Sequence, residues 1–418
     1  MRRVAITGVG AVTPVGNDAE TTWNALREGR SGVGAITAFD ASSFAVHIAG
    51  MVKDFDAETA IPDPALRRDL SRPGAFGVAA ALEALADAGL ADGGDYRPAE
   101  RGVSVGATAG RPALAEMAEI FHRLREELPL YRQPVEHVRE RDQNTPAAAI
   151  ARAGGCTGPM VGVSTACTAS GHALGEAYRI IQEGEARMML AGGYDSLISW
   201  LDVLGFSLLG ALTTDHADEP QRASRPFSDD RSGFVLGEGA VMFVLEDLES
   251  ARARGAHIHA EIVGYAATMN AYRMTDPPPD GGGVSLAMAQ ALEDAGLPAA
   301  EVGYIAAHGT STPGNDICET RAIKDVFGAH ADELAISSVK SMIGHLTAAA
   351  AGAGLLGALG VLRTGYAPPT INLERPDPAL DLNYVANTAQ AVDTDTVMVN
   401  AFAFGGTNAC LILRKDTP

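Results

Sequence analysis

Cys167 lies where a strand-like stretch gives way to a helix-like one, in the sequence VSTACTASGHALGEAYRII at 163–181. A thiolate at the N-terminus of a helix is stabilised by free backbone N–H groups and by the helix dipole, and both lower the thiol pKa. The small residues beside it, Ala166, Thr168, Ala169 and Ser170, leave room for a substrate. Cys167 is therefore a candidate nucleophile, although a cysteine that only fills space in a core fits the same stretch.

Two histidines stand in separate motifs later in the chain. His308 follows the apolar stretch VGYIAA, and Lys340 and His345 lie in KSMIGH, directly before a long stretch of small residues. The spacing does not show that these residues converge on Cys167, and either histidine alone would suit a structural role. Together with a cysteine at a helix N-terminus, they favour a thiol-based acyl-transfer site.

The stretch FAFGGTN at 402–408 supplies a further feature of such a site. Gly405 and Gly406 permit a backbone N–H to point into a cavity, as an oxyanion hole requires. An ordinary turn at the end of a strand is the alternative.

Composition limits the class of protein. The chain has 418 residues, 47 of them glycine, and a formal net charge of −20, which argues against a nucleic-acid partner. Its four cysteines fit neither a zinc pattern nor a disulfide framework. The N-terminal MRRVAITGVG lacks the apolar core of a signal peptide, and no apolar run reaches the roughly 18 residues that span a bilayer. We expect a soluble, reduced, cytoplasmic protein.

Apolar periodicity predicts strands that alternate with helices, which is typical of an α/β protein with layered sheets. The strands are expected at 2–10, 186–193, 238–247, 259–267, 302–307, 397–404 and 409–414. The helices are expected at 21–29, 74–90, 113–129, 285–297, 319–328 and 348–365. The segments 124–142 and 276–283 read as excursions from the core, the first as a solvated surface helix and loop.

Two weaker patterns concern the fold. Gly8-x-Gly10 resembles the start of a dinucleotide-binding loop, but Thr13 stands where the third glycine belongs, so a tight structural turn is favoured. A shift of 173 residues places Gly171 and His172 on Gly344 and His345, which suggests a duplicated fold in which two helix N-termini face each other.

The motifs together resemble those of the β-ketoacyl-acyl-carrier-protein synthases, and synthase II above all. The resemblance rests on VAITGVGAVTPVGN, STACTAS, SRPFSDDRSGFVLGEGA, AAHGTSTPGND, SSVKSMIGHLTAAAAG, APPTINLE and NAFAFGGTN, in this order. It implies the thiolase fold, five layers αβαβα built from two similar halves, which we place at 1–258 and 259–418. It also implies an acyltransferase that elongates chains on acyl carrier protein in fatty-acid or type II polyketide or polyene biosynthesis.

The resemblance also assigns roles. It implies that Cys167 accepts the acyl chain, that His308 and His345 assist decarboxylation of malonyl carrier, and that Lys340 and Glu319 form an ion pair that orders the site. Backbone N–H groups of Cys167 and Phe404 would form the oxyanion hole, and no metal or other cofactor would be needed. The remaining substrate-binding residues would be Phe402, Phe404, Gly405, Thr310, Thr312 and Phe206, and our candidates for carrier docking are Arg67, Arg68 and Arg72.

Several positions depart from the family pattern. Ala403 stands where a glycine usually precedes the gating Phe404, and Asn270 stands where elongating synthases usually have aspartate. The segment 124–142 does not resemble the usual cap over the acyl pocket, and ALTTDHADEP places acids where fatty-acid enzymes often carry a docking arginine. These departures favour a specialised polyketide or polyene pathway over housekeeping fatty-acid synthesis.

The resemblance leaves the assembly open and raises three alternative classes. A homodimer and a heterodimer with a chain-length-factor sister are both expected forms of an active synthase. A non-catalytic sister would lack the active cysteine, whereas Cys167 is present. A degradative thiolase would need a second cysteine near the C-terminus, and Cys410 reads instead as part of a buried strand. A priming synthase would have asparagine at His345.

Overall fold

The computed structural model describes residues 1–91, 93–129 and 135–416. Its main sheet has 10 strands in the order β10-β9-β13-β14-β8-β1-β7-β6-β4-β5. One half contains β1 (Val4–Val12), β4 (Arg101–Gly106), β5 (Met160–Val163), β6 (Met188–Ser196) and β7 (Glu238–Asp247). The other contains β8 (Ala260–Met269), β9 (Tyr304–Ala306), β10 (Ala335–Ser337), β13 (Thr396–Phe402) and β14 (Thr407–Arg414). Two small sheets pair β2 (Val33–Ala35) with β3 (Ile48–Gly50) and β11 (Tyr366–Ala367) with β12 (Gln390–Ala391).

The two halves repeat one pairing pattern. In the first, β5, β4 and β6 run parallel, and β7 and β1 continue the sheet antiparallel; in the second, β10, β9 and β13 are parallel, and β14 and β8 are antiparallel. Only a short antiparallel pairing of Val4–Ile6 with 260–262 joins the halves of the described sheet.

Helices cover both faces of each half. Those of the first half are α1 (Ala19–Arg27), α2 (Ala57–Ala60), α3 (Pro64–Arg67), α4 (Arg72–Asp87), α5 (Leu114–Arg125), α6 (Val135–Arg141), α7 (Asn144–Ala153), α8 (Ala169–Glu183), α9 (Trp200–Leu208) and α10 (Leu248–Ala253). The second half adds α11 (Gly282–Ala295), α12 (Pro313–Phe327), α13 (Lys340–Ile343) and α14 (Ala350–Thr364).

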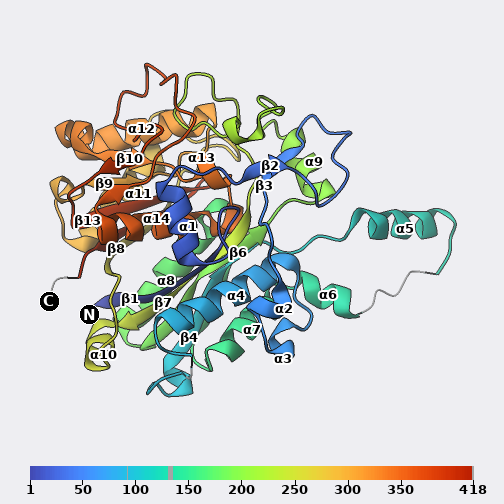
Figure 1. Cartoon of the computed structure of the whole chain (residues 1–418), viewed down its shortest axis with the longest axis horizontal. Helices are drawn as coiled ribbons and strands as arrows, with labels where there is room; N and C mark the ends of the chain where they lie inside the picture. Colours follow the sequence, from blue (N-terminus) through green and yellow to red (C-terminus); the bar gives the residue numbers. More distant parts are fainter. Residues whose placement is uncertain (92, 130–134, 417–418) are drawn as a thin grey trace.

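The central helices α8 and α14 contact strands of both halves, so they form a layer between them (Figure 1). Helices α4 and α7 cover the outer face of the first half, and α11 and α12 cover that of the second. The five layers αβαβα are therefore confirmed.

The predicted offset of the internal repeat is wrong. Helices α8 and α14, and the 3-10 turns before them, η2 (Ala166–Thr168) and η6 (Thr347–Ala349), correspond at an offset of 181 residues instead of 173. Each turn starts with a residue in the left-handed region, Ala166 at φ 50° and Thr347 at φ 47°. At this offset Cys167 corresponds to Ala348. The offset of 173 was misleading because sequences rich in alanine and glycine also match at unrelated offsets.

Gly8 and Gly10 belong neither to a nucleotide loop nor to a tight turn. Both lie inside β1, where α4 crosses it closely. A Cβ atom on Gly10 would lie 2.0 Å from the carbonyl oxygen of Ala80, and one on Gly8 would lie 2.1 Å from that of Ala84. The glycines therefore let the helix backbone approach the strand.

Gly10→Ala should lower the apparent thermal unfolding midpoint, because the added methyl group overlaps a backbone atom that cannot move without displacing α4. Overpacking of this kind costs about 1–3 kcal/mol. Gly34→Ala is the matched control, since nothing lies within 4 Å of its added Cβ. Equal midpoints for the two variants in differential scanning fluorimetry would contradict the packing described for Gly10.

One segment contradicts the prediction that no apolar run is long enough to span a bilayer. Thr347–Thr364 is long and apolar enough to cross a membrane, but 83% of it is buried inside the protein. It is the core helix α14 with its preceding turn, and small residues let it pack between the two half-sheets.

Helix α5 extends away from the body of the protein (Figure 1). The helix predicted at 113–129 is present, but its apolar face is exposed, with Leu114, Phe121 and Leu124 at 44%, 62% and 56% exposure. The surface helix predicted within 124–142 is α6, while residues 130–134 lie outside the described residues.

Candidate active site

Cys167 lies in the turn η2, at the N-terminal ends of both central helices. It lines a cavity of about 270 Å³ that also contains His308, His345 and Phe404. The left-handed Ala166 reverses the chain after β5 and places Cys167 directly before α8. Strain of this kind is often found at a nucleophile that is held in one orientation.

His345 contacts the cysteine directly. Its Nε2 lies 3.1 Å from Cys167 Sγ, and its Nδ1 accepts a hydrogen bond of 3.2 Å from the backbone N–H of Thr347. Burial and the Lys340 charge hold the pKa of His345 well below its ordinary value, so the ring is neutral near neutral pH. Because Nδ1 is an acceptor, the single proton is assigned to Nε2, which makes His345 a donor toward the cavity.

His308 lies beside His345, with ring centroids 5.4 Å apart, and it packs against Phe402 at 5.7 Å. It is 3% exposed, and its Nδ1 has no hydrogen-bond partner among the described residues. Burial, and then the charge of Lys340, lower the pKa of His308 well below its ordinary value. The site therefore holds two neutral imidazoles next to one thiol.

Lys340 and Glu319 do not form the predicted ion pair. Lys340 Nζ donates to the carbonyl oxygen of His308 at 2.5 Å, while the Glu319 carboxylate accepts the N–H groups of His308 and Gly309, both at 2.8 Å. Asn400 donates to the same carboxylate at 3.1 Å. Lysine and glutamate thus hold opposite ends of the His308 backbone, and burial raises the pKa of Glu319.

The loop after β13 places a backbone N–H against the sulfur. The backbone N–H groups of Phe404 and of Cys167 itself act on the sulfur and lower the pKa of the thiol. Gly405 and Gly406, at φ 87° and 81°, complete a tight turn that Ala403 enters without a left-handed φ. Asn270 N–H donates to Gly406 O at 2.7 Å, so the departure at Asn270 lies against this loop.

Burial raises the pKa of the Cys167 thiol to about 11, although the Lys340 charge and the two N–H groups act in the opposite direction. Burial also lowers the pKa of Lys340 to about 8. In the resting protein the cysteine is therefore a thiol near neutral pH.

Alkylation of Cys167 by iodoacetamide should be slow near neutral pH and should accelerate as the pH rises toward 11. Lys340→Met removes a positive charge that favours the thiolate, so it should slow alkylation below about pH 8 and matter less above it, where Lys340 itself becomes neutral. Intact-protein mass spectrometry gives the rates, and Cys167→Ala reports the reaction of the other cysteines. A rate that is independent of pH from neutrality upward would contradict the raised pKa.

The other predicted substrate-binding residues also line the cavity. Thr310 and Thr312 are joined by a hydrogen bond of 2.8 Å between their hydroxyl groups, and Phe206 lies with them in the wall. Phe402 is buried in the wall, whereas Gly405 is the exception, because the glycine that lines the cavity is its neighbour Gly406. Cys410 is buried in β14 and donates to Asn400 at 3.2 Å, as a structural cysteine would.

The three arginines predicted for carrier docking do not share one environment. Arg72 pairs with the buried Glu238 at 2.7 Å, while 46% of its side chain is exposed. Arg67 is part-exposed and donates to the carbonyl oxygens of Ile61 and Pro62, whereas Arg68 is exposed.

Sequence reasoning missed Asp195 at the end of β6. Its buried carboxylate accepts the hydroxyl groups of Thr347 and Thr108, at 2.5 and 2.8 Å, and the N–H of Ala348 at 2.9 Å. Burial raises the pKa of Asp195. Asp195 holds Thr347, and the backbone N–H of Thr347 fixes the tautomer of His345, so Asp195 positions the site indirectly. The signal in the sequence was an acidic residue close to the end of the apolar strand expected at 186–193.

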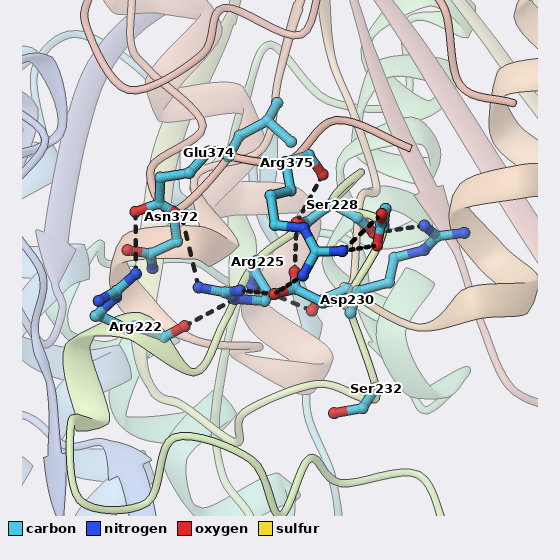
Figure 2. Close-up of polar contacts among 12 residues, drawn as sticks. Arg222, Arg225, Ser228, Asp230, Ser232, Asn372, Glu374 and Arg375 are labelled. Atoms are coloured by element: carbon cyan, nitrogen blue, oxygen red, sulfur yellow. Dashed lines mark hydrogen bonds and ion pairs between the residues drawn. The ribbon is translucent and has the colours of Figure 1, made fainter. Parts of the chain in front are cut away.

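A polar network fixes the segment that leads to Val235, the residue that binds the backbone of His345. Figure 2 shows Arg225 paired with Asp230, while Ser228 donates to Asp230 and to the carbonyl oxygen of Arg375, at 2.6 and 3.0 Å. This network ties the segment 222–232 to 372–375. A few residues later, Val235 O accepts the N–H of His345 at 2.7 Å. The motif SRPFSDDRSGFVLGEGA therefore supports the site through its backbone.

Family models match both halves of the chain. Residues 1–251 match the model described as beta-ketoacyl synthase, N-terminal domain, and residues 259–374 match beta-ketoacyl synthase, C-terminal domain. The 3-oxoacyl-acyl-carrier-protein synthase 2 of Synechocystis sp. is 43% identical over 99% of this chain and 98% of its own length. That of Vibrio harveyi is 42% identical over 99% of both chains.

Solved structures agree with these relatives. A beta-ketoacyl synthase from Burkholderia phymatum superposes with a TM-score of 0.90 at 35% identity, and the ishigamide ketosynthase/chain length factor with 0.88 at 36%. A type II polyketide ketosynthase, described in complex with its acyl-carrier protein and bound to the hexaketide, gives 0.89 at 34%. All three comparisons cover 100% of both chains. The chain belongs to the β-ketoacyl synthase family of acyl-transferring condensing enzymes.

Proposed function

We propose that Cys167 is the nucleophile that accepts the acyl chain and that His308 and His345 stabilise the enolate formed from malonyl carrier. The observation that carries this proposal is the His345 Nε2–H, held 3.1 Å from the Cys167 sulfur because Thr347 occupies Nδ1. The nucleophile belongs to a first half at 1–258 and both histidines to a second at 259–418. We take this division as the functional boundary.

In the first half-reaction, Cys167 Sγ attacks the carbonyl carbon of the acyl-carrier thioester. The bond from that carbon to the pantetheine sulfur breaks, and the thiol proton leaves with the pantetheine thiol. Negative charge develops on the carbonyl oxygen, and the N–H groups of Cys167 and Phe404 are the donors placed to receive it. The same donors favour the thiolate, which offsets part of the cost of burial.

In the second half-reaction, the bond between the malonyl carboxylate and its α-carbon breaks, and carbon dioxide leaves. The electron pair passes into an enolate whose thioester oxygen accepts hydrogen bonds from the two histidines. The α-carbon then attacks the Cys167 thioester, and the sulfur departs as a β-ketoacyl carrier forms. These steps balance without metal or redox chemistry. Neutral imidazoles suit them because they donate hydrogen bonds to the enolate oxygen without protonating the carbanion.

The carrier delivers both substrates through the mouth of the cavity. Thr310 and Thr312 are the hydroxyl groups placed to contact the pantetheine arm. Because carriers are acidic and this chain has a net charge of −20, docking requires a local basic patch. Arg67, Arg68 and Arg72 remain our candidates, and Arg72 is the one whose charge is already paired, with Glu238.

We propose a dimer that operates in the cytoplasm. The edge strand β5 is unpaired on its outer side within the described sheet, and Met160 in it is 50% exposed. The exposed apolar face of α5 offers further surface that a partner would cover. The partner is either a second copy or a chain-length-factor sister, and activity of the isolated chain with malonyl carrier would favour the second copy.

The test is reconstitution of the purified chain with acyl-carrier and malonyl-carrier thioesters, followed by mass analysis of the carrier. A product two carbons longer, bearing a keto group, is expected. The proposed function is refuted if the carrier is extended neither by the isolated chain nor by the chain co-expressed with sister subunits.

A further inference from the structure

A second cavity of about 330 Å³ adjoins the catalytic cavity. The two cavities share Thr108, Arg111 and Leu197, which line both of them. The wall between them is therefore one layer of side chains. Any role of the second cavity in binding the acyl chain rests on the proposed function, because only a chain held on Cys167 must extend along one of these spaces.

An ion pair forms part of this wall. Arg111 Nε lies 2.6 Å from Asp202 Oδ1, and the side chains are 50% and 4% exposed. A carboxylate buried to this degree requires a cation or several donors. Ser199 donates to the other oxygen of Asp202 at 2.5 Å, so the carboxylate is fixed and Arg111 is held by it.

Helix α9 links this pair to the catalytic cavity. Asp202 lies in its first turn, and Phe206 comes four residues later on the same face. Phe206 lines the catalytic cavity, whereas Asp202 lines the second one. Because Phe206 and Arg111 both line the cavity that holds Cys167, a chain bound on Cys167 that extends along Phe206 can reach the guanidinium of Arg111.

The second cavity carries several polar groups among its apolar ones beyond the wall. Its lining includes Ser71, Glu116, His137, Gln143, Ser196 and Ser199, together with the buried Asp195. A saturated alkyl chain would displace water from these groups and give them no hydrogen bond in return, which is costly. A keto or hydroxyl oxygen could accept from Arg111, because Asp202 engages only the Nε side of a guanidinium that has five N–H donors.

We propose that the second cavity is the distal part of the acyl site and takes chains that carry keto or hydroxyl oxygens, with Arg111 as the residue that selects them. Saturated chains are accepted only when they are too short to reach Arg111 and Asp202. This assigns a substrate class to the enzyme, oxygenated acyl chains, and gives Arg111 and Asp202 a role in specificity.

The test compares kcat/KM for elongation of acyl carriers from butyryl to dodecanoyl with that of partners of equal length that bear a keto group on the penultimate carbon. We define the ratio as kcat/KM for the keto substrate divided by kcat/KM for the saturated substrate of equal length. For short chains this ratio should be near one. For chains long enough to reach Arg111, the keto substrate should be favoured by about tenfold or more, because a site built to donate a hydrogen bond rejects an analogue that lacks the acceptor.

The double variant Arg111→Met/Asp202→Asn neutralises the wall without leaving a buried charge. It should lower the ratio for long chains by about tenfold or more, chiefly by accelerating saturated substrates. Arg111→Lys keeps a donor and should keep the preference. The matched control is Arg97→Met/Glu100→Gln, which removes another Arg–carboxylate pair, one that lines neither cavity.

A ratio near one at every length in the wild type, or a ratio that the double variant leaves unchanged, would overturn the inference. Butyryl carrier separates this outcome from failure of the proposed function. If butyryl is elongated while long chains show no preference, only the role of Arg111 is wrong. If butyryl is not elongated, the proposed function is refuted, and the inference with it.

Discussion

Cys167→Ala should abolish chain elongation while the protein still releases carbon dioxide from malonyl carrier. The variant removes the atom that holds the acyl chain, but it leaves His308, His345 and the N–H of Phe404 in place. Loss of a covalent nucleophile commonly costs on the order of 10⁴-fold or more. Elongation is measured by mass analysis of the carrier, and decarboxylation by release of labelled carbon dioxide.

Two other cysteines provide controls for this variant. Cys156 lies outside the lining of the catalytic cavity, and Cys410 is buried in β14. Cys156→Ala and Cys410→Ala should keep elongation within a few-fold of the wild type, apart from any loss of folded protein. Loss of elongation in Cys410→Ala with normal folding would instead indicate a two-cysteine mechanism of the thiolase type. Elongation that survives in Cys167→Ala would contradict the central assignment.

His308→Asn and His345→Asn should both suppress decarboxylation, by about 10²–10⁴-fold, because the shorter asparagine amide cannot place its donor where the ring Nε2 lies. Their effects on acylation should differ. His345 contacts the Cys167 sulfur at 3.1 Å, whereas no such contact joins His308 to Cys167 in the described part of the chain. His308→Asn should therefore still be acylated at nearly the wild-type rate, while His345→Asn should be acylated more slowly.

Single-turnover acylation and malonyl decarboxylation, measured separately, distinguish these roles. Thermal unfolding of each variant checks that the buried substitution has not unfolded the site. Equal loss of acylation in both variants would show that the histidines act as one structural unit and would remove the reason for assigning them to decarboxylation.

The candidate catalytic residues could be named from the sequence, whereas several of their contacts could not. Cys167, His308 and His345 stand in motifs whose order along the chain indicates the family. The structure places them in one cavity. The expected ion pair of Lys340 and Glu319 was wrong, because a motif shows that two residues occur together but not which backbone atoms they bind.

Other features depend on long-range packing that no local pattern carries. Asp195 supports His345 through Thr347, a contact that spans 152 positions in the chain. Gly10 is explained only by the passage of α4 over β1, and the sequence does not show that the apolar face of α5 is exposed. The alternation of strands and helices was predicted well, because buried strands and amphipathic helices leave clear local periodicities.

The role of Cys167 is tested most directly by peptide mapping after the purified protein is mixed with acyl carrier alone, without malonyl carrier. We expect one acyl adduct, on the peptide that contains Cys167, which disappears when malonyl carrier is added and an extended product forms. An adduct on another residue, or extended product from a protein that never carries an acyl group on Cys167, would contradict that role.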